Sequence, residues 1–238
     1  MYQIPDGKPT QDAVTWALEA GYRHIDTAKF YRNEQSVGKA VRSSKIDRQD
    51  IWITTKIWPI DQLSVQRAFD TSLDKLDLDY IDLYLVHFPV PGFVKRTWKA
   101  MEAIYRSGKC RAIGVSNHSV QQMQDIMSIA SIPIAVNQIR CSPFHFDREL
   151  YDFCVDQEIG FEAYSPLTQG RQLGNQTVQE IATHHQKSPA QVLIRWALQK
   201  NMIVIPKSSH QDRIAENADV YDFEISSAEM NILDGLAE

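Results

Sequence analysis

The chain has 238 residues and an ordinary globular composition, with 43% hydrophobic residues, 23% charged residues and a formal net charge of -5. These values exclude a disordered, fibrous or membrane-embedded chain. The acidic balance supplies no basic field to hold a polyanion, so we expect no nucleic-acid partner. No stretch rich in Pro, Gly or Ser divides the chain, which predicts a single domain over residues 1–238.

The cysteines and the first residues bear on the cellular compartment. The chain has three cysteines and no CxxC pair, which favours neither a disulfide framework nor a zinc site. The opening residues MYQIPDGKPTQD lack the basic and apolar regions of a signal peptide, and no apolar run approaches the ~20 residues that cross a bilayer. We therefore expect a cytoplasmic protein with no membrane partner and no bound metal.

In chain order, short apolar and β-branched runs alternate with amphipathic stretches. The first amphipathic stretch follows Thr10 or Asp12, either of which can cap a helix that runs to Ala20 and ends at Gly21. The predicted strands are residues 22–26, 51–57, 81–88, 112–115, 134–139, 160–164 and 202–205.

Helix signals lie between these strands. Apolar residues stand three and four apart in residues 64–76 and 98–105, the pattern of an amphipathic helix. Ser119 and the pair Ser188-Pro189 are N-terminal signals of two further helices. Strands of nearly continuous hydrophobicity, with single helices between them, are typical of a parallel sheet covered by helices. Such a sheet is either a closed barrel or an open doubly wound sheet, and periodicity does not decide between the two.

Both of these folds collect their chemistry at the C-terminal ends of the strands. The first three strands end in HIDTAKFYRNE, WITTKIW and LYLVHFP, whose candidate side chains are Asp26, Tyr31, Lys56 and His87. Taken singly, His87 is explained as a hydrogen-bonded core histidine and Lys56 as a solvated side chain. Asp26 is explained as a helix cap and Tyr31 as a packing residue with a wet hydroxyl.

Taken together, these four residue types suit the reduction of a carbonyl group. Hydride transfer leaves negative charge on the carbonyl oxygen, so the site needs a proton donor and polar groups directed at that oxygen. Tyr31 can be the acid if Lys56 favours its phenolate form, and Asp26 can keep Lys56 charged. His87, as a neutral donor, can orient the carbonyl or share in the proton relay.

Seven motifs in a fixed order then point to one family. They are GYRHIDTAKFYRNE at 21–34, TTKIW at 54–58, LVHFP at 85–89, GVSN at 114–117, VNQ at 136–138, YSPL at 164–167, and IPKS with RIAEN at 205–217. The chain resembles the aldo-keto reductases in these motifs over almost its whole length. The resemblance implies a parallel (β/α)8 TIM-type barrel, NADPH or NADP+ as cofactor, and a catalytic tetrad of Asp26, Tyr31, Lys56 and His87.

The later motifs resemble the family's cofactor cleft. By this resemblance Ser116, Asn117 and Gln138 hold the nicotinamide carboxamide, and Tyr164 stacks on the nicotinamide ring. Ser165 and Leu167 are the corresponding pyrophosphate contacts. Without the resemblance these residues are turn-forming polar groups and an aromatic residue at a strand end.

A basic group follows the last strand. Lys207, Ser208 and Arg213 stand at the opening of a helix, where two cations and a hydroxyl fit the 2′-phosphate of NADP. The ordinary explanation is a solvated basic turn. Glu216 and Asn217 lie against the adenine by resemblance. No G-x-G-x-x-G occurs, so a Rossmann dinucleotide site is unsupported.

The chain departs from the family pattern at both ends. Relatives begin with a hairpin and a first barrel strand ending in Gly-Thr-Trp or similar, whereas residues 1–3 stand where that strand would end. A barrel that lacks this strand is expected to have two unpaired strand edges and weaker nicotinamide contacts. The chain also stops soon after its last helix, which predicts an open and less selective substrate pocket walled by Phe30, Trp58 and Phe88.

The leading hypothesis is a monomeric reductase that transfers hydride from NADPH to small aldehydes or ketones, reversibly, with Tyr31 as the acid. A different class of answer is a non-catalytic relative that binds NADP(H) as a regulatory subunit. A third is a truncated product that neither folds well nor turns over.

Overall fold

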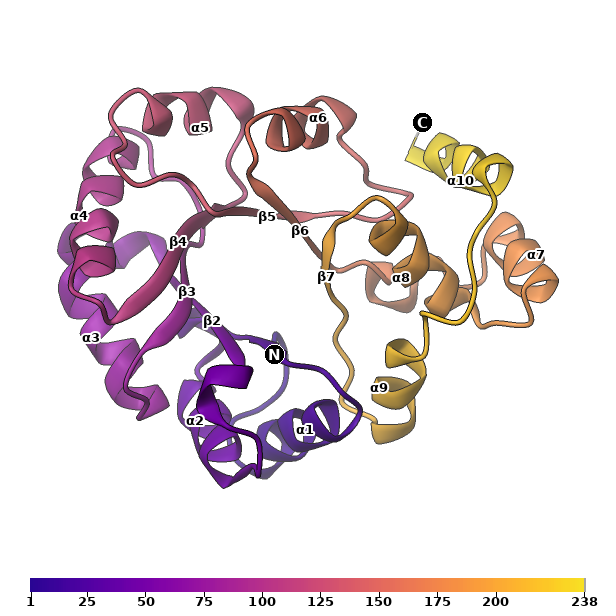
Figure 1. The fold of residues 1–238 in the computed structure, drawn as a ribbon, viewed down its shortest axis with the longest axis horizontal. Coiled ribbons are helices and arrows are strands. Elements are labelled where there is room, and N and C mark those ends of the chain that lie inside the picture. Colours follow the sequence, from indigo (N-terminus) through magenta and orange to yellow (C-terminus); the bar gives the residue numbers. More distant parts are fainter. Residues whose placement is uncertain (238) are drawn as a thin grey trace.

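The computed structural model describes residues 1–237, and within them seven parallel strands form one curved sheet surrounded by helices (Figure 1). The strands are β1 (His24–Asp26), β2 (Trp52–Ile57), β3 (Ile81–Val86), β4 (Cys110–Ser116), β5 (Val136–Arg140), β6 (Gly160–Tyr164) and β7 (Ile203–Ile205). Each predicted strand is present, and the curved arrangement decides for the barrel over the open sheet.

The helices follow the strands around the outside of the barrel. They are α1 (Lys8–Glu19), α2 (Glu34–Ser43), α3 (Val65–Leu76), α4 (Val94–Arg106), α5 (Val120–Met127), α6 (Arg148–Asp156), α7 (Gln176–His184), α8 (Pro189–Gln199), α9 (Gln211–Ala218) and α10 (Ser227–Asp234). Two helices, α7 and α8, lie between β6 and β7, so the expectation of a single helix in every connection is wrong at this point.

The predicted N-caps agree with the structure at two helices and differ from it at α1. Ser119 and Ser188 begin helices as the sequence predicted, and each forms a capping box, with Gln122 and Gln191 as the partners. The predicted cap of α1 is wrong, because the N-cap is Gly7. Thr10 lies inside the helix, where its hydroxyl donates to the Pro5 carbonyl at 2.7 Å. Asp12 also lies inside α1.

The barrel is not closed by hydrogen bonds between its first and last strands. Strand pairing runs from β1 to β7 in chain order, and within residues 1–237 these two strands do not pair with each other. A cavity of about 490 Å³ lies there, lined by His24 and Trp52 on one side and by Ile203 and Val204 on the other. The two expected unpaired edges are therefore present.

The first residues lie over the C-terminal end of β1. The Met1 nitrogen donates to the Asp26 carbonyl oxygen at 2.6 Å. The side-chain amide of Asn33, which is buried, donates to the carbonyls of Met1 and Ile4 at 3.0 Å each. These contacts anchor the opening segment beside the strand end that carries Asp26.

Alternation along the strands separates two environments. Paired residues of neighbouring parallel strands point to the same side, so Lys56 and its partner Leu85 share one face, as do Gln138 and its partner Glu162. This face is the barrel interior, and it combines an apolar cluster around Leu85 with buried polar groups. The opposite face packs against the helices and forms the main hydrophobic core.

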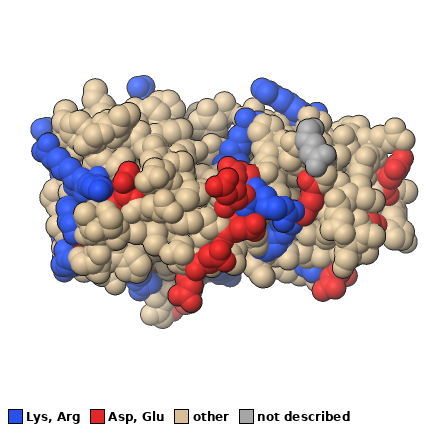
Figure 2. All heavy atoms as spheres, turned by 90° about the horizontal axis from the view of Figure 1, so that it is seen from above, with Lys and Arg blue, Asp and Glu red and all other residues tan. Residues whose placement is uncertain are grey.

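The surface carries charges of both signs. On the face shown in Figure 2, acidic and basic side chains are interspersed among neutral ones. In the described part of the chain, no helix combines the length and hydrophobicity that a bilayer crossing requires. The cysteines Cys110, Cys141 and Cys154 are free and buried.

Close packing of α2 on α3 generates a stability prediction. A Cβ atom at Gly38 would lie 1.8 Å from the Leu76 carbonyl oxygen, a backbone atom that no side-chain rotation can move. We expect Gly38→Ala to lower the free energy of unfolding by about 2 kcal/mol or more, measured by urea denaturation. Gly235→Ala is the control, because nothing lies within 4 Å of its added methyl. It should stay within about 0.5 kcal/mol of the wild type, and equal effects of the two changes would contradict the packing argument.

Candidate active site

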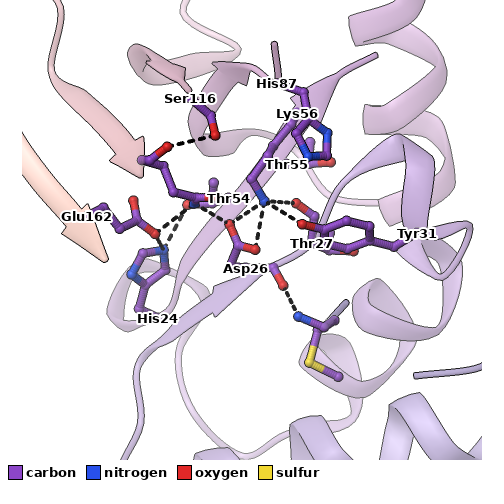
Figure 3. A network of polar contacts seen from close by, with 12 residues as sticks. His24, Asp26, Thr27, Tyr31, Thr54, Thr55, Lys56, His87, Ser116 and Glu162 are labelled. Carbon is purple, nitrogen blue, oxygen red and sulfur yellow. Dashed lines mark hydrogen bonds and ion pairs between the residues drawn. The ribbon is translucent and has the colours of Figure 1, made fainter. Parts of the chain in front are cut away.

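Three strand ends bring the four predicted catalytic residues together at the mouth of the barrel (Figure 3). Asp26 is the last residue of β1, and Lys56 lies near the end of β2. His87 follows β3 directly, and Tyr31 closes a short 3-10 helix of residues Lys29–Tyr31. Positions as much as 61 residues apart in sequence therefore share one site because parallel strands end on the same side.

The centre of the site is a buried ion pair. The Lys56 ammonium lies 2.7 and 2.6 Å from the two carboxylate oxygens of Asp26 and 2.8 Å from the Thr27 carbonyl. Burial alone would lower the pKa of Lys56, but Asp26 and Tyr31 outweigh it and raise that pKa. Burial likewise opposes the ionisation of Asp26, yet Lys56 holds its pKa below the usual value. Both groups are therefore charged at neutral pH.

Tyr31 presents its hydroxyl to this pair. The Tyr31 hydroxyl oxygen lies 3.5 Å from the Lys56 nitrogen. Burial raises the pKa of Tyr31 to about 12, while Lys56 acts in the opposite direction. The next residue, Arg32, has φ 59°, a left-handed conformation that ends the 3-10 helix immediately after Tyr31. The phenol is thus held in its protonated form beside a cation.

His87 lies edge-on to Tyr31, with their ring centroids 5.8 Å apart. Burial lowers the pKa of His87 to about 3, and the charge of Lys56 adds to the effect. The imidazole is therefore neutral at physiological pH. Its Nδ1 is buried and has no hydrogen-bond partner among residues 1–237. A neutral ring with an unused polar atom suits the orientation of a polar ligand.

Aromatic rings surround the mouth. Phe30 stacks on Trp58 with a centroid distance of 4.0 Å, and Trp58 meets Phe88 edge to face at 5.9 Å. The structure therefore brings together the three residues predicted as apolar walls. Tyr2 adds a fourth ring, 5.2 Å from Tyr31, which the sequence did not indicate. Three of these rings, Tyr2, Phe30 and Phe88, are exposed large hydrophobic side chains.

The ends of β4, β5 and β6 form a second polar group. The Asn117 side-chain amide donates to the His87 carbonyl at 3.0 Å and accepts from the Tyr164 hydroxyl at 3.0 Å. The Ser116 hydroxyl donates to the Gln138 carbonyl at 2.8 Å. The Asn117 amide also donates to the Ser116 hydroxyl at 3.0 Å, so the four predicted nicotinamide residues are joined to one another and to the His87 carbonyl.

Strained backbone marks two of these strand ends. Asn117 has φ 59° and Ser165 has φ 53°, left-handed values that cost energy for residues other than glycine. A buried His118 supports the first of them by bonding through Nδ1 to the Ser116 carbonyl at 2.8 Å. Leu167 lies partly buried in the loop that follows β6. Such strain clusters at ligand sites.

The residues predicted to contact the adenine and the 2′-phosphate of the nucleotide lie after β7. Lys207 and Arg213 are exposed, Ser208 is half-buried and Asn217 is buried. The helix α9 begins after His210 without a side-chain cap. Gln191 on α8 donates to the carbonyl of Glu216 at 3.2 Å and so fixes α9 on the barrel. The two cations therefore stand at the start of a helix whose first N–H groups are not capped by a side chain, an arrangement that favours an anion.

The sequence did not single out two other residues of this site. Glu162 on β6 and His24 on β1 both point into the barrel interior near Asp26 (Figure 3). Their signal was a charged or polar residue within an otherwise apolar strand, but sequence position alone did not tell the interior face from the helix face.

Comparison with known proteins fixes the class. The family model described as the aldo/keto reductase family matches residues 6–238. Glyoxal reductase of Bacillus subtilis is 43% identical over 238 residues, covering 99% of this chain and 86% of that protein. A solved aldo-keto reductase from a Medee basin deep-sea metagenome library has a TM-score of 0.96 at 40% identity, covering 99% of this chain and 89% of that one.

A further solved structure carries the nucleotide. An aldo-keto reductase of Bombyx mori in complex with NADP has a TM-score of 0.89 at 34% identity, covering 97% of this chain and 84% of that one. The chain belongs to the aldo/keto reductase family. It is an oxidoreductase, and the family resemblance seen in the sequence motifs is confirmed.

The buried ion pair generates a prediction about stability. Lys56→Met removes the cation and leaves the Asp26 carboxylate buried without compensation, so the free energy of unfolding should fall by about 3–5 kcal/mol. The double change Lys56→Met with Asp26→Asn removes both charges and should lose less than Lys56→Met alone. Urea denaturation at neutral pH measures both, with the exposed Lys39→Met as control. A double variant that is less stable than Lys56→Met would show that the two charges do not compensate each other.

Proposed function

We propose that this protein reduces the carbonyl group of small aldehydes or ketones with NADPH, and that Tyr31 donates the proton. The observation that carries the proposal is the Tyr31 hydroxyl, 3.5 Å from the buried Lys56 ammonium. Membership of the aldo/keto reductase family supports the same reaction class. The reverse reaction, oxidation of an alcohol, would use the same residues in their opposite protonation states.

The residues present fit a nicotinamide nucleotide. Gln138 donates both N–H groups of its amide inside the barrel, to Asp26 and to Glu162, so its remaining oxygen can accept from a carboxamide. Ser116, Asn117 and Tyr164 supply further polar and aromatic groups at the same mouth. Ser165, Leu167, Lys207, Ser208, Arg213, Glu216 and Asn217 would hold the remaining parts of the nucleotide. When bound there, NADPH supplies the hydride.

The chain's own residues manage the proton. Burial keeps Tyr31 protonated at neutral pH, with a pKa of about 12, so it enters the reaction as an acid. Once the carbonyl oxygen becomes negative, the Tyr31 proton can move to it, and the phenolate left behind is stabilised by Lys56. Asp26 keeps Lys56 charged throughout. A ring N–H of the neutral His87 can donate to the carbonyl oxygen and align it with Tyr31.

The mouth of the barrel suits small substrates and should select only weakly among them. Its walls are the exposed rings of Tyr2, Phe30 and Phe88 with the half-buried Trp58, and they offer apolar contact without many directed polar groups. A relative of 43% identity is named glyoxal reductase, which supports a small aldehyde as substrate.

Monomeric state, cytoplasmic location and the absence of a nucleic-acid partner stay predictions from the sequence.

An assay of NADPH consumption with a reactive aromatic aldehyde tests the proposal. Consumption that depends on both enzyme and aldehyde supports a reductase. A protein that binds NADPH, seen as a rise in melting temperature, but consumes none would instead be the non-catalytic relative considered from the sequence. A protein with no cooperative melting transition would be the poorly folded, inactive alternative considered from the sequence.

Removal of the proton donor is the most direct test of the site. Tyr31→Phe deletes one hydroxyl and keeps the ring packing, so kcat should fall by about 10²-fold or more while NADPH binding stays within about threefold. Steady-state kinetics and fluorescence titration with NADPH measure the two quantities. Tyr105→Phe, on the outer helix α4, is the control. If Tyr31→Phe retains most of the wild-type turnover, another group donates the proton.

The residues proposed to bind the 2′-phosphate, at the start of α9, give a second test. Arg213→Ala should weaken NADPH binding by about tenfold and leave NADH binding within about twofold, because only NADPH carries the 2′-phosphate. Binding constants for both nucleotides measure the difference, with the exposed Arg67→Ala on α3 as control. Equal losses for NADPH and NADH would exclude a contact of Arg213 with the 2′-phosphate.

A further inference from the structure

A second carboxyl group lies in the barrel interior beside the catalytic pair and has no part in the reaction proposed above. The Glu162 side chain on β6 is fully buried. Its Oε1 accepts a hydrogen bond from the Gln138 side-chain amide at 3.0 Å (Figure 3). Its Oε2 has no partner among residues 1–237. A carboxyl group so placed needs a reason, because burying an ionised carboxylate without compensation is costly.

The groups that face Glu162 come from three strands. On β1, His24 Nε2 lies 3.9 Å from Glu162 Oε1, and Asp26 lies on the far side of the Gln138 amide. On β2, the Lys56 cation also acts on Glu162, but it is held against Asp26. On β5, Gln138 is neutral. Burial lowers the pKa of His24 to about 4, so His24 supplies no positive charge at neutral pH.

The charges in this interior balance only if Glu162 is neutral. Lys56 contacts both carboxylate oxygens of Asp26 and so compensates one negative charge. A second negative charge on Glu162 would have no cation of its own. Burial raises the pKa of Glu162 to about 8, and the charge of Asp26 adds to the effect. Glu162 is therefore mostly protonated at neutral pH.

The Gln138 amide ties the two carboxyl groups together. Its nitrogen donates to Asp26 Oδ2 at 2.9 Å and to Glu162 Oε1 at 3.0 Å, which uses both of its hydrogens. With the nitrogen fixed between two acceptors, the amide oxygen must face away from both. Glu162 thus orients Gln138 and helps to place the Asp26 carboxylate that holds Lys56.

We infer that Glu162 is a positioning residue that acts while protonated, and that its ionisation weakens proton donation by Tyr31 at alkaline pH. The inference rests on the proposed function, because it concerns the acid of that reaction. An ionised Glu162 adds a second negative charge on the interior side of the Lys56–Asp26 pair. That charge disfavours the Tyr31 phenolate, the state that proton donation leaves behind, so the reduction becomes slower.

Ionisation of Glu162 should make both the reduction rate and the stability of the protein depend on pH. For reduction, kcat/KM of the wild type should fall as pH rises through about 8, where Glu162 ionises. Stability should fall over a wider range, from the unfolded to the folded pKa of Glu162, since a carboxyl group whose pKa is raised on folding stabilises the folded state below its unfolded pKa. That contribution is lost as pH rises through the folded value.

The test uses Glu162→Gln, which keeps the shape and one acceptor oxygen but cannot ionise. At about pH 6 its kcat/KM for aldehyde reduction should stay within about threefold of the wild type. Its alkaline decline should move up by about one pH unit or more, because the group that ionises is gone. The exposed Glu19→Gln is the matched control and should keep the wild-type profile.

Stability and infrared spectra give readouts that do not depend on turnover. The stability of Glu162→Gln relative to the wild type should increase between about pH 5 and pH 9, as followed by urea denaturation. The infrared absorption of a buried protonated carboxyl should be present in the wild type at neutral pH, disappear at alkaline pH, and be absent from Glu162→Gln.

The outcomes separate the two proposals. If the protein reduces no aldehyde, the proposed function fails, while the infrared and stability measurements still decide whether Glu162 is a protonated group. If Glu162→Gln changes neither stability nor the infrared band, Glu162 is not protonated and the inference is wrong. If both change but the alkaline decline of reduction stays where it is in the wild type, the influence on Tyr31 is wrong.

Discussion

The site depends on one buried ion pair, Lys56 with Asp26. An ammonium group with no exposure to solvent stays charged only if a carboxylate lies against it, and here both carboxylate oxygens lie within 2.7 Å. The 3-10 helix that follows β1 then brings the Tyr31 hydroxyl to 3.5 Å from the Lys56 nitrogen. Burial would leave the phenol a very weak acid, and the nearby cation is the feature that makes proton donation chemically reasonable.

The parallel strands bring further polar side chains into the barrel interior beside this ion pair. Residues in register point to the same side, so the interior receives Lys56 from β2, Gln138 from β5 and Glu162 from β6. The interior therefore combines apolar side chains such as Leu85 with buried polar ones. Because Lys56 compensates one carboxylate, the net charge of this interior depends on how many of its carboxyl groups are ionised.

The barrel is open between its first and last strands and at its mouth. β1 and β7 do not pair within residues 1–237, and exposed aromatic rings border the mouth. The residues proposed to act on the carbonyl lie on or just after β1 to β3, whereas those proposed to hold the nucleotide lie from the end of β4 to α9. Chemistry and nucleotide binding are thus supported by different parts of the same sheet, and contacts between Asn117, Tyr164 and the His87 carbonyl connect them.

The sequence by itself predicted the strand order, most of the helices and the family, and it brought out four residues as the candidate catalytic group. It could do so because strand ends and motifs are local signals, and seven motifs appeared in one order. The strand pattern did not separate a barrel from an open sheet, but the family resemblance implied the barrel and the structure confirmed it. Only the tertiary structure decided that Tyr2 joins the aromatic wall. It also decided that Glu162 lies beside Asp26. These facts depend on which strands are neighbours and which face of a strand points inward, and neither is encoded at any one position of the chain.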